Sequence, residues 1–247
     1  MMHIAAFLTA LIAGAIAAMS GFGIGSLLTP LLAVRYGTKL AVAMVSVPHL
    51  AGTAARFIGL RGQVDRRVFL NFGILSAAGG LAGALLNARA GSPVLAVVFG
   101  CLLVFAAVSG LTGLLDRKHF GRSTAWIAGA LSGFFGGLVG NQGGIRSAAL
   151  LGFDIRKEAL VATATAIALI VDGARMPVYF AIESRAMLAD WPVLITCIVG
   201  VLLGTFWGVR LLRQIEELTF RKLIYILILA LGVYMLIHGA TELTIRT

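Results

Sequence analysis

Charged residues are scarce in this chain of 247 residues. Asp, Glu, Lys and Arg together make up 12 % of the sequence, whereas 60 % of the residues are apolar. An average soluble domain is about a quarter charged, and a water-soluble fold of this length could not cover its surface with so few charges. The mean hydropathy of +0.99 and the long uncharged runs predict a membrane protein and argue against a soluble enzyme.

Cysteine is almost absent as well. Cys101 and Cys197 both lie within apolar runs, and the sequence contains no Cys-x-x-Cys pair and no His/Cys spacing typical of a metal site. Neither a disulfide framework nor a zinc site is predicted, and no motif indicates a cofactor.

Acidic residues are half as frequent as basic ones, with 10 against 20. No basic cluster is interleaved with stacking aromatic residues on a polar segment, so the excess does not indicate nucleic-acid binding. Membrane proteins keep Lys and Arg in cytoplasmic loops, next to anionic lipid. The positive net charge therefore predicts contact with membrane lipid.

Six uninterrupted apolar spans follow one another along the chain with short polar breaks between them. They are 40–60, 68–88, 93–115, 158–182, 187–212 and 219–240. Each has roughly 20 residues or more, which is enough to cross a ~30 Å hydrocarbon core as a helix. No break between them is long enough to hold a soluble domain. The predicted fold class is therefore an all-α, polytopic membrane protein.

Two further apolar segments, residues 4–35 and 123–152, are interrupted by glycine. The first contains SGFGIGS at 20–26 and the second contains GGLVGNQGG at 136–144. Glycine at this density breaks a helix, and irregular backbone survives in lipid only where protein or a watery cavity satisfies its polar groups. Both segments are predicted to be glycine-broken re-entrant hairpins.

The two interrupted segments are related to each other. Sliding the sequence along itself aligns Gly21 with Gly140, and the same ungapped register brings Arg56 onto Arg175. The chain is therefore predicted to be two repeats, 1–119 and 120–247, within one integrated transmembrane domain. A slightly different register pairs a second group of glycines with its counterparts: Gly79 and Gly83 with Gly200 and Gly204.

The distribution of positive charge selects the orientation. Arg146 and Arg175 lie within apolar runs and are set aside. If the two hairpins do not cross, thirteen of the other basic residues fall on one side and five on the other, and the positive-inside rule places the larger group in the cytoplasm. Each half then has one hairpin and three crossings. Since three is odd, the two repeats are inverted and both termini are predicted to be non-cytoplasmic. The smaller group consists of Arg35, Lys39, Arg89, Arg185 and Arg246.

Polar groups inside a bilayer are costly, so each one is a functional hypothesis. The free N–H groups of broken helices suit an oxyanion, amide side chains donate hydrogens, and arginine supplies charge with a planar fork. These residue types predict a binding site for a small anion near the midplane, between the repeats, and no metal site. The candidates lie at the two hairpin tips and on the helix that follows each tip: Ser20, Gly21, Gly23, Gly25, Ser46, His49, Arg56, Asn141, Gln142, Gly143, Gly144, Arg146, Thr165, Asp172 and Arg175.

Some of these residues also have structural interpretations. Asp172 and Arg175 are three apart on one predicted helix, so they neutralise each other if they pair. Arg146 either binds the anion or snorkels from a helix end to the membrane surface. His49, next to Pro48, either relays a proton in the range of about pH 5 to 8 or is a hydrogen-bonded packing residue.

One pattern resembles a known family. The run SGFGIG at 20–25 with Pro30, followed by 41–46, recurs as GFFGGLVGNQGG at 133–144, followed by 159–165. It is similar to the TauE/SafE sulfite and organosulfonate exporters, also called the 4-toluene sulfonate uptake permease family, over nearly the whole chain. The resemblance implies secondary transport of sulfite, sulfonates or related anions across the bacterial inner membrane, which makes the non-cytoplasmic termini periplasmic.

The sequence therefore predicts a secondary transporter for a small sulfur-containing anion, an organosulfonate or sulfite, with a proton or a sodium ion as the candidate coupling partner. A channel or carrier for another small anion or for a metal ion is the alternative. An enzyme is not predicted, because no HExxH, GxSxG or Ser/His/Asp grouping is present. The direction of transport and the oligomeric state stay open.

Overall fold

The computed structural model of the protein describes residues 2–21, 23–113, 122–141, 156–208 and 217–246, together with Gly143, Arg146 and Leu150. Every regular element in these ranges is a helix, so the predicted all-α class is confirmed. The elements are α1 (Met2–Ser20), α2 (Ile24–Leu60), the 3₁₀ turn η1 (Arg61–Gln63), α3 (Arg66–Arg89), α4 (Ser92–Thr112), α5 (Arg122–Val139), α7 (Lys157–Ala189), α8 (Trp191–Leu203), the π-helical turn η2 (Gly204–Gly208) and α10 (Glu217–Arg246).

Six of the described helical stretches are long and apolar enough to cross a membrane, which confirms a multi-pass membrane protein. The set differs from the predicted one at two places. The N-terminal stretch is long enough to cross although the sequence predicts only a hairpin arm there. The predicted span 187–212 begins in the last residues of α7 and continues up to residue 208 as the short α8 and η2. The six are Met2–Met19, Ile24–Gln63, Arg66–Arg89, Ser92–Thr112, Glu158–Ala189 and Lys222–Ile245.

Two helices run further than the hydropathy pattern predicts. α7 continues past residue 182 through Glu183 and Arg185 and ends at Ala189, because Glu and Arg are good helix formers even though they interrupt an apolar run. α2 contains both the second arm of the first predicted hairpin and the predicted span 40–60. Its two parts meet at Gly37, whose φ of 73° and ψ of 158° are accessible to glycine and strained for other residues.

The kink at Gly37 is fixed by contacts with two neighbouring corners of the chain. The Tyr36 hydroxyl donates to Oδ2 of Asp190 at 2.7 Å, between α7 and α8. Lys39 Nζ donates to the carbonyl oxygen of Ala88 at 2.7 Å, near the end of α3. These contacts hold the α2 kink, the α3–α4 corner and the α7–α8 corner together at one end of the molecule.

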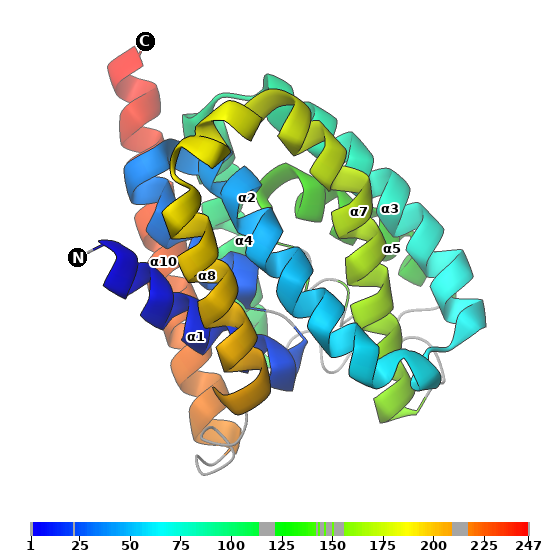
Figure 1. The fold of residues 1–247 in the computed structure, drawn as a ribbon. Helices are drawn as coiled ribbons and strands as arrows, with labels where there is room; N and C mark the ends of the chain where they lie inside the picture. Colours follow the sequence, from blue (N-terminus) through cyan, green and yellow to red (C-terminus); the bar gives the residue numbers. More distant parts are fainter. Residues whose placement is uncertain are drawn as a thin grey trace.

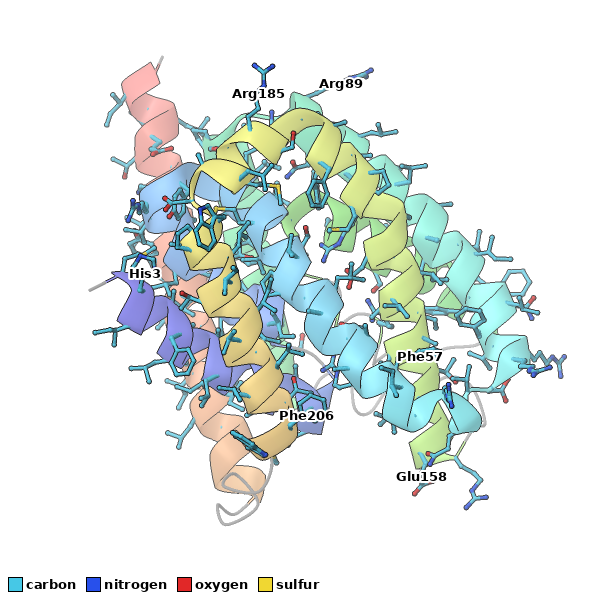
Figure 2. The ribbon with its side chains drawn as sticks, viewed as in Figure 1. His3, Phe57, Arg89, Glu158, Arg185 and Phe206 are labelled. Carbon is cyan, nitrogen blue, oxygen red and sulfur yellow. The ribbon has the colours of Figure 1, made fainter. Side chains whose placement is uncertain are left out.

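The two ends of the molecule carry different labelled residues in Figure 2. Arg89 and Arg185 lie at one end, whereas Phe57 and Glu158 lie at the opposite end. The sequence assigns Arg89 and Arg185 to the side with few basic residues, so the structure places these two together as that assignment requires.

The helices pack in a small number of extensive pairs. α3 packs against α5 and α7, α8 with η2 packs against α1 and α2, α4 packs against α10, and α2 packs against α7. Figure 1 shows α3, α5 and α7 gathered on one side and α1, α8 and α10 on the other, with α2 running between them. The glycine breaks after α1 and α5 therefore lie next to the central helices α2 and α7.

Candidate functional site

The helices α1 and α5 end in the same way. The N–H of Gly21 donates to the carbonyl oxygen of Ala17 at 2.9 Å, and the N–H of Gly140 donates to that of Gly136 at 3.0 Å. Gly21 has a φ of 79° and Gly140 a φ of 77°, in the left-handed region that glycine adopts without strain. Each break therefore terminates a helix sharply and turns the chain away from the helix axis.

Two arginines hold these helix ends, Arg175 buried and Arg56 partly buried. The Arg56 guanidinium on α2 donates to the carbonyl oxygen of Ala17, and Arg175 Nη1 on α7 donates to that of Gly136 at 2.6 Å. Each of these two carbonyls already accepts from a glycine N–H, and the end of a helix carries partial negative charge. The guanidinium therefore adds a second hydrogen bond to the carbonyl at each break and offsets the helix dipole there.

Asp172 links the two central helices through a buried charged cluster. Its Oδ2 lies 2.7 Å from Nδ1 of His49 on α2, and its Oδ1 lies 2.8 Å from Nη2 of Arg175 on its own helix. Asp172 is fully buried, and Arg175 is 1 % exposed. The predicted pairing of Asp172 with Arg175 is present, and His49 joins it from across the interface.

A small cavity lies where the two glycine breaks meet these helices. Its lining residues come from both halves of the chain, and they are Gly21, Gly23, Gly25, Ser26, His49, Gly140, Asn141, Gly143 and Arg146. The lining combines backbone at the two breaks with a hydroxyl, an amide, an imidazole and a guanidinium. Such a set donates several hydrogen bonds and supplies positive charge, which suits a small anion.

Arg146 is a buried lining residue whose side chain is only partly hydrogen-bonded. It is 2 % exposed, and its Nη1 donates to the carbonyl oxygen of Ala164 at 3.0 Å. Among the residues that the structure describes, its Nε and Nη2 have no hydrogen-bond partner. A buried charge with few partners is strongly unfavourable, and the two donor atoms are of a kind that can bind an anion. At this depth Arg146 does not snorkel to the surface.

The structure brings seven of the fifteen predicted residues together around the cavity. Ser46 and Thr165 do not join them, because their hydroxyls donate to Ala43 O at 2.6 Å and to Val161 O at 2.8 Å within their own helices. Arg56, Asp172 and Arg175 make the contacts with helix ends and His49 described above. Gln142, Gly144 and the side chain of Ser20 lie outside the described residues. The seven are Gly21, Gly23, Gly25, His49, Asn141, Gly143 and Arg146.

Three residues of this region are absent from the predicted set. Ser26 and Gly140 line the cavity, and both belong to the glycine-broken runs from which the other candidates came. Tyr179 is buried, and its hydroxyl donates to the carbonyl oxygen of Gly137. Its position four residues after Arg175 puts both on one helix face, a spacing that could have identified it. Within the described ranges, no group of three or more His, Cys, Asp or Glu gathers to hold a metal ion.

Comparison with known proteins adds one match. The family model described as "Sulfite exporter TauE/SafE" matches residues 6–235 of the chain. No curated protein and no solved structure matches it.

Proposed function

This chain belongs to the TauE/SafE family of sulfite exporters, which are membrane transporters and not enzymes; from that membership we propose that it is a secondary transporter for a small sulfur-containing anion. The proposed cargo is an organosulfonate or sulfite, and the proposed location is the bacterial inner membrane with both termini periplasmic.

The observation that carries the assignment is the buried guanidinium of Arg146. A sulfonate has three oxygens that share one negative charge, so it needs several donors and at least one positive charge in a place from which water is excluded. Arg146, whose Nε and Nη2 have no partner among the described residues, lines the same cavity as Ser26 and Asn141. Together they offer the donors and the charge that a sulfonate requires.

The two breaks and their arginines support an inverted repeat as the basis of transport. In the alignment of the two halves, Arg56 corresponds to Arg175 and Ala17 corresponds to Gly136. Arg56 donates to the carbonyl of Ala17, and Arg175 donates to the carbonyl of Gly136. Equivalent residues thus make equivalent contacts in the two halves. A site between two such repeats can open to either side of the membrane as one repeat rocks against the other.

The helix pairs support the same repeat. If α1, α2, α3 and α4 correspond to α5, α7, α8 and α10, the pair α3–α5 corresponds to α8–α1, and α3–α7 to α8–α2. Exchanging the two halves turns α2 into α7 and α4 into α10, so the pairs α2–α7 and α4–α10 are unchanged by the exchange. All six contacts are present, and a two-fold relation between the halves requires them together. In this arrangement the predicted hairpins are α1 with the first part of α2, and α5 with the segment after it.

The energy for transport comes from an ion gradient or from the gradient of the anion itself. The sequence contains no GxxxxGK[ST] motif for a nucleotide and no segment long enough for a soluble ATPase domain. A proton and a sodium ion are the candidate coupling ions.

Binding to purified protein in detergent tests the proposal. Sulfite, thiosulfate, taurine and methanesulfonate should each be screened for a rise in apparent melting temperature, since a ligand at a hundred times its Kd stabilises the native state by about 2.7 kcal/mol. Arg146→Ala should weaken binding of the best ligand by about 2–5 kcal/mol, which is roughly thirty-fold or more in Kd.

The matched control is Arg185→Ala, because Arg185 is exposed at one end of the molecule and does not line the cavity. It should leave affinity unchanged. Wild-type affinity in a well-folded Arg146→Ala variant would show that the anion binds elsewhere.

A further inference from the structure

Comparing the two repeats separates buried polar residues with a structural role from those without one. Arg56 and Arg175 make the same helix-end contact at aligned positions, so this contact explains both. His49 and Asp172 have no such counterparts, because the aligned positions hold Ala168 and Thr53. The carboxylate of Asp172 also attracts Arg56, but the side chain that Arg56 contacts is that of Thr53, whose hydroxyl accepts from Arg56 Nη2 at 3.3 Å. The contact between His49 and Asp172 therefore has no counterpart in the half that contains α1 and is not part of the helix-end contact.

His49 stands between the cavity and the buried carboxylate. It is 8 % exposed and lines the cavity, while its Nδ1 lies 2.7 Å from Asp172. An imidazole that donates Nδ1–H to a carboxylate presents Nε2 as an acceptor. No partner for Nε2 is found in the described part of the chain. Nε2 is thus placed to take a proton while Asp172 stabilises the resulting cation.

The charged groups around His49 come from three parts of the chain. Asp172 and Arg175 face it from α7, Arg56 lies on its own helix, and Arg146 shares the cavity. The described parts of α4, α8 and η2 carry no charged residue. His3 of α1 and Arg122 of α5 lie at the ends of those helices away from the breaks. Three guanidiniums therefore oppose one carboxylate around His49 while the site is empty, which disfavours a further positive charge.

We propose that His49 binds the proton that accompanies the anion, so that anion and proton occupy the cavity together. This inference rests on the proposed function. A proton from water adds to Nε2 of neutral His49 when the anion binds at Arg146, and it leaves to water on the other side when the anion is released. The anion offsets the repulsion of the three guanidiniums, so each ligand strengthens the binding of the other by the same factor. The anion and the proton together add no net charge to the buried cluster. This keeps low the electrostatic cost of carrying them across the membrane.

Proton uptake on anion binding tests this directly. The probe is methanesulfonate, or the tightest sulfonate in the screen that lacks an amine, since the charge of such a ligand does not change between about pH 5 and 9. Calorimetry in two buffers of different ionisation enthalpy measures the protons taken up. We expect up to one proton to be taken up for each anion bound. We also expect the affinity for the anion to fall by about 5- to 150-fold as the pH rises through the range in which His49 loses its proton.

The variant H49Q should take up no proton and should bind with the affinity of the wild-type protein at high pH, whatever the pH. The matched control is H238Q, because His238 also faces a carboxylate, with Nε2 3.4 Å from Oε1 of Glu242, but lies half-exposed on α10. H238Q should keep both the proton uptake and the pH dependence of the wild-type protein.

The outcomes separate this inference from the function on which it rests. Anion binding without proton uptake in the wild-type protein, at an affinity independent of pH, would refute proton coupling and leave the anion site intact. Proton uptake that persists in folded H49Q would show that another group carries the proton. Failure of every anion to bind would overturn the proposed function and this inference with it. The wild-type measurement decides whether a proton accompanies the anion even if H49Q does not fold.

Discussion

The close contact between α3 and α5 depends on glycine at position 83. A Cβ added there would meet the carbonyl oxygen of Phe134 and lie 2.8 Å from the backbone nitrogen of Leu138. Backbone atoms of a neighbouring helix cannot rotate away as a flexible side chain does. Gly83→Ala therefore forces the two helices apart along an interface that small residues keep close.

The expected cost follows from two opposing terms. Alanine is favoured over glycine in a helix by about 1 kcal/mol, whereas overpacking costs about 1–3 kcal/mol, with a backbone contact at the upper end of that range. The net destabilisation of Gly83→Ala should be about 2 kcal/mol, or about 4–8 °C in melting temperature for a chain of this size. Gly200→Ala, which would meet Ala10 Cβ at 2.7 Å and Phe7 O at 2.9 Å, should have the same sign at the interface of α8 with α1.

Thermal unfolding in detergent, followed by intrinsic fluorescence and checked by size-exclusion chromatography, measures the effect. The control is Gly59→Ala in α2, because an added Cβ there meets nothing within 4 Å; it should be neutral or slightly stabilising. A Gly83→Ala protein as stable as the Gly59→Ala protein would refute the packing argument.

Two more outcomes are expected. Alkaline phosphatase fused after Thr247 should be active and a fusion in the loop at residues 61–65 inactive, because the predicted side with more basic residues is cytoplasmic; the reverse pattern would rule out this orientation. Tyr179→Phe should lower stability by about 1 kcal/mol, since the carbonyl of Gly137 loses a buried donor, whereas Tyr234→Phe on an exposed side chain should not. Equal melting temperatures for the two tyrosine variants would contradict the role given to Tyr179.

The membrane class and the two glycine breaks could be predicted from the sequence because both are local properties. Hydropathy needs only a window of about 20 residues, and Gly21 and Gly140 take positive φ values that other residues adopt only with strain. Helix ends were less predictable. Glu183 and Arg185 interrupt the apolar pattern but not the helix, so hydropathy misplaced the end of α7.

The partners of the arginines could not be predicted from residue types. Arg175 donates to the carbonyl of Gly136, 39 residues away, and a backbone carbonyl has no signature in the sequence. The sequence offers Asp172 as the neighbour of Arg175, and that pairing is present, but it is only part of what Arg175 does. For the same reason the free donors of Arg146 become visible only when the surrounding backbone is in place.

The contact between His49 and Asp172, 123 residues apart, is different, because the proposed repeat contains enough information to predict it. His49 aligns with Ala168, which lies one helical turn from Asp172 on α7, and Asp172 aligns with Thr53, one turn from His49 on α2. When two aligned helices pack on each other about a two-fold axis, a residue of one lies near the residues that flank its own counterpart on the other. His49 and Asp172 form a polar pair across the axis, but the symmetry-related positions hold Ala168 and Thr53. The pair therefore breaks the symmetry of the proposed repeat. Such a pair can bind a ligand that the repeat alone does not require, which is why the proton is assigned to His49 and not to either arginine.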